Sequence, residues 1–367
     1  MKKIVLFLFL SHFFFAQQNN QLWKGYFSYN EIVDVESAEG KIFAATQNAF
    51  FSEIIASNEL NIYNSITGFK SDVITSIHHS EIHNKTFAGN ANGLILIQNS
   101  DGSVITKVDI IEEVPVAPNK KRINDFYEMA GRLYIATDYG ISVIDLATLE
   151  FITTYFIGPA GEESEVLQTT ILNNELYAVT RNFGIRKASL TNPNIFDFNF
   201  WQTFDSGYWN GIVTFNNQLV ATNTNGRTYR YTGTTFQEIL NQNQVSSSLK
   251  TNGTVLTVTS LNHIYILNQS LSIVEHITQI PNLDVQFTAA TVVDNYIFIG
   301  TKENGLFKTT ITNPTDFIQM APNGPLQNYS FRVKKGPNTL WVVHGDYTQQ
   351  FNPYPLDELG ISTYKIE

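Results

Sequence analysis

The sequence predicts an all-β protein, a β-propeller built from four-stranded antiparallel blades. Aromatic residues are abundant, with 27 Phe and 17 Tyr, and such residues favour strands. A short pattern also recurs eight times: three or four apolar residues, a Thr or small polar residue, and a polar turn that often contains Gly. Its aligned positions are 37 to 47 residues apart, the usual length of a propeller blade. These positions are Thr46, Asn90, Thr137, Thr180, Thr222, Thr259, Thr301 and His344.

Each repeat unit contains four predicted strands, because a further strand precedes and follows the central hairpin. Segments 73–79, 123–129 and 166–172 precede a hairpin, and segments 60–64, 104–110 and 150–157 follow one. A single blade cannot bury both of its faces, so neighbouring blades must cover them in a closed ring. A β-sandwich would not repeat its motif, and a β-helix has a much shorter period. Eight repeat units fit a ring of seven or of eight blades, and of the two we predict seven.

Three regions are expected along the chain. Lys2 and Lys3 precede the apolar run 4–10, and Ala16 ends a second run, a pattern typical of a signal peptide over residues 1–16. Residues 17–330 form the propeller. Residues 331–367 form either its last blade or the start of a second, incomplete propeller. No other segment reaches the ~18 apolar residues of a membrane span, so we predict an exported protein of the periplasm or outer-membrane surface without a transmembrane span.

Small residues are expected at two places in each hairpin. Glycines fit turns that need a positive φ, and small residues before them let neighbouring blades pack closely. The turn glycines are Gly93, Gly140, Gly184, Gly226 and Gly305. The small residues are Ala45, Ala88, Ala136, Ala221 and Gly300.

Composition and motifs argue against several classes of function. The chain has 23 basic and 33 acidic residues and no Cys, which argues against a nucleic-acid partner and removes disulfides and thiolate chemistry. Glu81, His79 and His83 cluster, but on the turn between the first two strands of a blade rather than on a helix, so no metal is expected. No local catalytic motif is present. We therefore predict a protein without catalytic residues or cofactor, not an enzyme.

Binding is predicted at one mouth of the ring. The strand path brings the loops between second and third strands, and the connections between blades, to the same end. These loops are polar and carry local positive charge and two aromatic residues, which suit an anionic glycan or phosphate. The predicted binding residues are Lys120, Lys121, Arg122, Arg181, Tyr208, Trp209, Arg227 and Lys302.

The sequence resembles two kinds of known propeller. Segment 67–97 resembles the two-component regulator propeller repeat, with Gly68, Ser71, Val73, Ile77 and Gly93 at matching positions. Segments 23–52, 122–146, 154–166 and 192–201 are similar, in the same order, to the PorZ family. This second resemblance runs from about residue 22 to residue 354.

The PorZ resemblance implies a role in the type IX secretion system. Members of that family bind anionic lipopolysaccharide and belong to a cell-surface attachment complex with a sortase, which implies those two partners here. The family architecture is two propellers followed by a C-terminal β-sandwich sorting domain. We therefore expect this chain to be a truncated product or the N-terminal part of a split gene. The shared motifs form the blade scaffold and identify no ligand-binding residue.

Two alternatives remain open at the level of sequence. The first is the glycan-sensing propeller of a hybrid two-component regulator, which would continue into a membrane helix and a kinase. The second is a secreted propeller glycosidase or lyase. Such an enzyme would need clustered carboxylates, or a Tyr and His pair, at the mouth of the ring.

Overall fold

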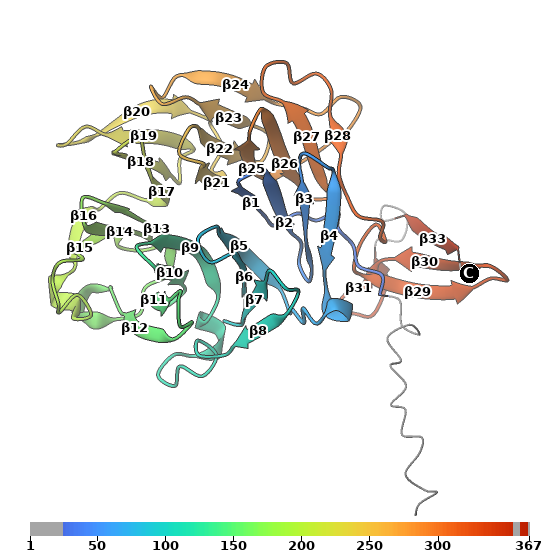
Figure 1. Cartoon of the computed structure of the whole chain (residues 1–367), viewed down its shortest axis with the longest axis horizontal. Helices are drawn as coiled ribbons and strands as arrows, with labels where there is room; N and C mark the ends of the chain where they lie inside the picture. Colours follow the sequence, from blue (N-terminus) through green and yellow to red (C-terminus); the bar gives the residue numbers. More distant parts are fainter. Residues whose placement is uncertain (1–24, 355–359, 366–367) are drawn as a thin grey trace, which may run out of the picture.

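The protein is described by a computed structural model over residues 25–354 and 360–365, and the predicted signal peptide lies outside them. Seven four-stranded antiparallel sheets stand radially around an axis (Figure 1). Their innermost strands contact one another in the circular order β1, β5, β9, β13, β17, β21, β25 and back to β1. The predicted seven-bladed propeller is therefore confirmed.

The strands of each blade follow chain order from the axis outward. The innermost strands are β1 (Asp34–Ala38), β5 (Ile74–Ser80), β9 (Ile123–Met129), β13 (Val166–Leu172), β17 (Trp209–Phe215), β21 (Ser246–Thr251) and β25 (Phe287–Val293). The second strands are β2 (Lys41–Ala45), β6 (Lys85–Asn90), β10 (Arg132–Thr137), β14 (Glu175–Thr180), β18 (Gln218–Asn223), β22 (Leu256–Ser260) and β26 (Tyr296–Thr301).

The third and fourth strands complete the blades. The third strands are β3 (Phe50–Ile54), β7 (Ile95–Asn99), β11 (Gly140–Asp145), β15 (Gly184–Ser189), β19 (Arg227–Tyr231), β23 (Ile264–Leu267) and β27 (Leu306–Thr310). The outermost are β4 (Glu59–Tyr63), β8 (Val104–Lys107), β12 (Phe151–Tyr155), β16 (Gln202–Asp205), β20 (Phe236–Asn241), β24 (Ile273–Ile277) and β28 (Ile318–Gln319). Short 3-10 helices lie in the loops: η3 (Ser65–Thr67), η4 (Pro118–Lys120), η5 (Pro159–Gly161) and η6 (Phe198–Phe200).

The repeated Thr at the end of the second strand closes the following turn. The Oγ1 atoms of Thr137, Thr180 and Thr301 donate to the carbonyl oxygens of Gly140, Gly184 and Gly305 at 2.7 to 3.0 Å. Asn90 stands where most units have Thr, and its Nδ2 donates in the same way to the carbonyl of Leu94 at 3.0 Å. The same bond is made by Thr46 to the carbonyl of Ala49, so the repeat visible in the sequence reflects a hydrogen bond found in five of the seven hairpins. The hydroxyls of Thr222 and Thr259 have no hydrogen-bond partner within the described residues.

The apolar core is divided among the interfaces between blades. Seven clusters of buried side chains each join residues of two neighbouring blades, including one between the first and the seventh. At that last interface the N–H of Ile32 donates to the carbonyl of Thr301 at 3.0 Å. A Cβ added to Gly300 would lie 2.6 Å from Ile32 Cγ2, which explains the small residue expected there. Each blade thus covers the face of the next.

The two mouths of the ring differ in their loops. We call the end formed by turns 39–40, 81–84, 130–131, 173–174, 216–217, 252–255 and 294–295 the AB mouth, since these turns join first and second strands. The opposite end, the DA mouth, carries the turns between second and third strands and the connections between blades. The loop path predicted from the sequence is therefore the path observed.

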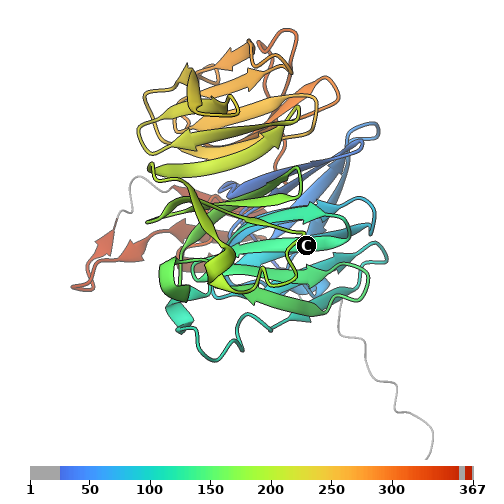
Figure 2. The ribbon, with the colours of Figure 1, turned by 90° about the vertical axis from the view of Figure 1, so that its left-hand side faces the viewer.

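A smaller unit follows the ring. Strands β29 (Ser330–Lys335), β30 (Thr339–His344) and β33 (Ile361–Lys365) form a three-stranded sheet, and β31 (Asp346–Tyr347) pairs with β32 (Pro353–Tyr354). This sheet stands beside the ring rather than in it (Figures 1 and 2). The eighth repeat unit is therefore not one of the blades that close the ring, and its place in a second propeller stays a prediction.

Candidate functional site

All eight residues predicted to bind lie at the DA mouth or in the connections leading to it. Lys120 ends η4, and Lys121 and Arg122 follow it before β9. Arg181 and Lys302 lie in hairpin turns, and Arg227 begins β19. Tyr208 and Trp209 lie where the chain enters β17.

Half of these residues are open to solvent and unengaged by ion pairs. The side chains of Lys120, Arg122 and Lys302 are exposed, and Tyr208 is 76% exposed. In the part of the chain that the structure describes, none of the three cations has a carboxylate within ion-pair distance. These four side chains are therefore accessible to a ligand from solvent.

The other four are engaged within the protein. Lys121 is buried, and its Nζ donates to the carbonyls of Ile111 and Glu113. Arg181 pairs with Glu165 at 2.7 Å, and Arg227 pairs with Glu238 at 2.8 Å. Trp209 is buried, and its Nε1 donates to Asp205 Oδ1 at 2.8 Å.

The structure brings only some of the eight together. The charges of Lys120, Arg122 and Arg181 all act on Asp138, on the side of the mouth formed by the third and fourth blades. Burial raises the pKa of Asp138, and the hydrogen bond from Asn124 and the charges of Arg122 and Lys120 oppose that rise. Tyr208 and Arg227 belong to the fifth blade, and Lys302 to the seventh. These residues are therefore spread over three parts of the mouth: the third and fourth blades, the fifth blade and the seventh blade.

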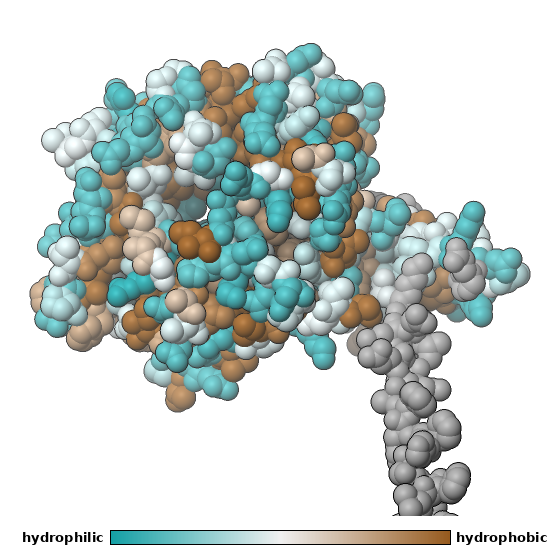
Figure 3. All heavy atoms as spheres, viewed as in Figure 1, coloured by the Kyte–Doolittle hydropathy of each residue, from teal (hydrophilic) through white to brown (hydrophobic). Residues whose placement is uncertain are grey.

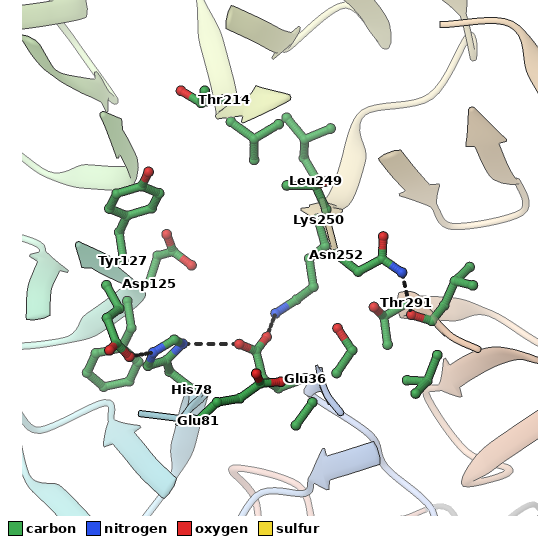
Figure 4. Close-up of a pocket in the computed structure, with 18 of the residues that line it drawn as sticks. Glu36, His78, Glu81, Asp125, Tyr127, Thr214, Leu249, Lys250, Asn252 and Thr291 are labelled. Atoms are coloured by element: carbon green, nitrogen blue, oxygen red, sulfur yellow. Dashed lines mark hydrogen bonds and ion pairs between the residues drawn. The ribbon is translucent and has the colours of Figure 1, made fainter. Parts of the chain in front are cut away.

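A second candidate site lies on the axis of the ring, where sequence reasoning placed none. A cavity of about 440 Å³ opens toward the AB mouth and is lined by innermost strands of all seven blades. Figure 3 shows a small opening at the centre of the ring, and Figure 4 shows the side chains inside. Two of the lining residues are basic, Lys250 and His78. Six are acidic, namely Glu36, Glu39, Glu81, Asp125, Glu128 and Asp294.

A charge network crosses this cavity. His78 Nδ1 lies 3.0 Å from Glu36 Oε1, and His78 Nε2 lies 2.9 Å from Glu128 Oε2, so one imidazole joins three neighbouring blades. Lys250 Nζ, from the sixth blade, lies 3.0 Å from Asp34 Oδ1 and 3.3 Å from Glu36 Oε2. Because the first and sixth blades are not neighbours, these two contacts bridge the channel.

The network shifts the pKa values of its members in the directions expected for paired charges. Burial alone would raise the pKa of Glu36, but Lys250 and His78 lower it to about 2. Burial alone would lower the pKa of His78, but Glu128 and Glu36 raise it to about 9. His78 is therefore protonated at neutral pH and cannot serve as a general base.

Asp125 differs from the other acids in the channel. Within the described residues its carboxylate receives no hydrogen bond and has no ion-pair partner. Burial raises its pKa to about 7, and Asp34 and Glu36 add to the rise against the charge of Lys250. Asp125 also lines a second, polar cavity of about 140 Å³ on the DA side of the channel. Asp125 therefore lies where the two cavities meet, a place that we call the waist of the channel.

The sequence did carry a signal for this site. The strand 34–38 reads DVESA, with two acids at alternating positions, and Asp125, Glu128 and Lys250 lie within other innermost strands. Charged residues are rare at buried strand positions unless they are paired. What the repeat pattern could not give is which blades face each other across the axis.

The comparisons with known proteins agree with the observed fold. Residues 42–202 match the family model described as the type IX secretion system PorZ N-terminal β-propeller domain. A comparison with curated proteins gives no match.

Three solved structures share the architecture. PorZ of Porphyromonas gingivalis, described as an essential bacterial surface component of the type IX secretion system, is 18% identical with a TM-score of 0.74. The match covers 89% of this chain and 43% of that chain. A virginiamycin B lyase from Staphylococcus aureus is 13% identical (TM-score 0.58, 78% of this chain and 97% of that chain). The computationally designed protein Ika8 is 12% identical (TM-score 0.51, 86% and 93%). At these identities the structural likeness shows the fold alone.

Proposed function

We propose, on the premise that residues 42–202 match the PorZ N-terminal β-propeller domain, that the chain is a non-catalytic binding component of type IX secretion. The family match carries this proposal. The propeller binds anionic lipopolysaccharide at its DA mouth and acts with the sortase complex at the cell surface. Among residues 25–354 and 360–365, no helix is long and apolar enough to cross a membrane.

The features of the DA mouth support a polyanionic ligand. Lys120 and Arg122 are exposed and free of ion pairs within the described residues, and their charges, like that of Arg181, act on Asp138. Tyr208 offers an exposed aromatic ring on the same mouth, suitable for stacking on a sugar. Lys121, Trp209 and Arg227 support the loops instead. We therefore centre the proposed site on Lys120 and Arg122.

The lyase likeness does not favour an enzyme here. His78 is the imidazole in the channel, and it is held as a cation between Glu36 and Glu128. Within the described residues, no hydroxyl nucleophile is hydrogen bonded to Asp125. A binding role needs neither a base nor a nucleophile.

The test is retention of anionic lipopolysaccharide and sortase-complex proteins by the purified mature chain. We expect the double variant K120E/R122E to lose at least about tenfold in lipopolysaccharide affinity, because two cations become repulsive. The matched control K334E/K335E makes the same change in net charge on exposed residues of β29 and should bind as the parent does. Equal weakening by both variants, or no retention by the parent chain, would contradict the proposed function.

A further inference from the structure

The axial cavity is built for a ligand of the opposite charge to the one proposed at the DA mouth. Its two cations are already neutralised, Lys250 by Asp34 and Glu36, and His78 by Glu36 and Glu128. Within the described residues, the four other acids of the lining, Glu39, Glu81, Asp125 and Asp294, have no ion-pair partner. The cavity therefore holds an excess of negative charge.

These four acids are arranged along the path into the channel. Glu39, Glu81 and Asp294 lie in exposed turns of the AB mouth on three neighbouring blades, and Asp125 lies at the waist. A cation that enters from the AB mouth meets the exposed carboxylates first and Asp125 last. Clefts lined by charge of one sign concentrate ligands of the other sign.

An independent observation marks the wall of the same cavity. Thr169, on β13, is 1% exposed and lines the cavity, yet its Oγ1 has no hydrogen-bond partner within the described residues. Buried polar atoms are nearly always satisfied, so this hydroxyl is an exception. Its Oγ1 has less than 1 Å² of accessible surface, so a ligand in the cavity would contact it only after the Thr169 side chain changes rotamer. Thr169 and the unpaired Asp125 come from neighbouring blades and line the same cavity.

We propose that the axial cavity binds a small ammonium or guanidinium group, which enters from the AB mouth and pairs with Asp125. The volume of about 440 Å³ accommodates a free diamine or an inserted Lys or Arg side chain, but not a polymer. The carboxylates at the entrance oppose anions. The site is separate from the DA mouth and does not depend on the proposed lipopolysaccharide role.

Binding at this site has a pH signature. The groups that act on Asp125 are Lys250 on β21, Asp34 and Glu36 on β1, and His78 on β5. The raised pKa of Asp125, about 7, means that a bound cation, which favours the ionised carboxylate, displaces a proton. Affinity should therefore rise roughly tenfold between pH 6 and pH 8, as Asp125 ionises.

The experiment is calorimetric titration of the propeller with two probes at pH 6 and pH 8. Agmatine represents a free small cation, and an acetylated peptide ending in arginine amide represents a side chain presented by a partner. We expect at least one probe to bind at pH 8 and D125N to weaken it at least tenfold. T169V should weaken it less. The exposed carboxylate of Glu112 lies in a connection of the DA mouth, so the control E112Q should leave binding unchanged.

The outcomes separate the possibilities. Binding of agmatine and peptide alike indicates a small-molecule site, whereas binding of the peptide alone indicates a partner's side chain. D125N removes an acid that is unpaired and costly to ionise, so it should fold at least as stably as the parent at pH 8, which a thermal melt checks. No binding of either probe at millimolar concentration, or binding that is indifferent to D125N or to pH, would overturn the proposal. Lipopolysaccharide retention is unaffected by any of these outcomes.

Discussion

At the scale of single residues, Lys250 links the sixth blade to the first through two ion pairs. It pairs with two acids of the first blade although the seventh blade stands between them, and its own pKa is raised because Asp34, Glu36 and Asp125 outweigh the effect of burial. Removing one partner of a buried pair leaves an uncompensated charge. The cost of that loss can be measured directly.

We expect K250M to destabilise the protein by about 2 to 3 kcal/mol, because Glu36 and Asp34 lose their cation in a half-buried site. Denaturant unfolding measures the change. The control is K302M, which removes an exposed lysine without an ion pair in the described structure. If the two variants lose the same stability, the charge bridge across the channel does not stabilise the ring.

His78 predicts how stability depends on pH. Its folded pKa, about 9, lies above the ordinary value of 6.5, so its contribution is complete below about pH 6.5 and is lost as pH rises toward 9. Asp125 changes the stability mainly at lower pH, because its pKa is raised from 3.8 to about 7. The free energy of unfolding should fall between pH 7.5 and 9 by on the order of 1 to 2 kcal/mol. In H78Q that decrease should be absent; a decrease of the same size would assign it to other groups.

At the scale of strands, the innermost strand of a blade has one feature that the sequence pattern did not reveal. The register shifts by one residue near the start of six of the seven innermost strands. Three of the extra residues reach the next blade: Thr75, Asn124 and Asn210 donate to the carbonyls of Ile123, Val166 and Ser246. The bulge thus turns a side chain outward to fasten neighbouring blades.

We expect N210A to cost about 1 kcal/mol, because Asn210 Nδ2 donates to both the carbonyl and the hydroxyl of Ser246 at 2.8 and 3.0 Å. Denaturant midpoints provide the measurement. Asn225 lies in an exposed turn of the same blade, so N225A is the matched control and should change stability little. Indistinguishable midpoints would show that these bonds do not hold the fifth and sixth blades together.

At the scale of the whole molecule, the repeat was enough to predict the architecture but not the channel. The Thr or Asn at the end of the second strand closes the turn by the same bond in five of the seven blades, and its spacing predicted the blades and the loops of each mouth. Glu36, His78 and Lys250 are non-repeating substitutions within the innermost strands, far apart in sequence. The contacts of Lys250 with the first blade depend on closure of the ring, which leaves only the seventh blade between the sixth and the first.

Closure itself can be tested at Gly300. A Cβ there would lie 2.6 Å from Ile32 Cγ2 and 3.0 Å from Thr288 Oγ1, in the contact between the last blade and the first. Overpacking of this kind costs about 1 to 3 kcal/mol, so we expect G300A to destabilise the ring by that amount. Hydrogen exchange should rise first in β1 and β25, because their contact joins the ends of the ring. The control is G336A, whose added Cβ has no neighbour closer than 3.3 Å. Uniform exchange across all seven blades would mean that this contact is no weaker than the others, and that the ring opens without a preferred seam.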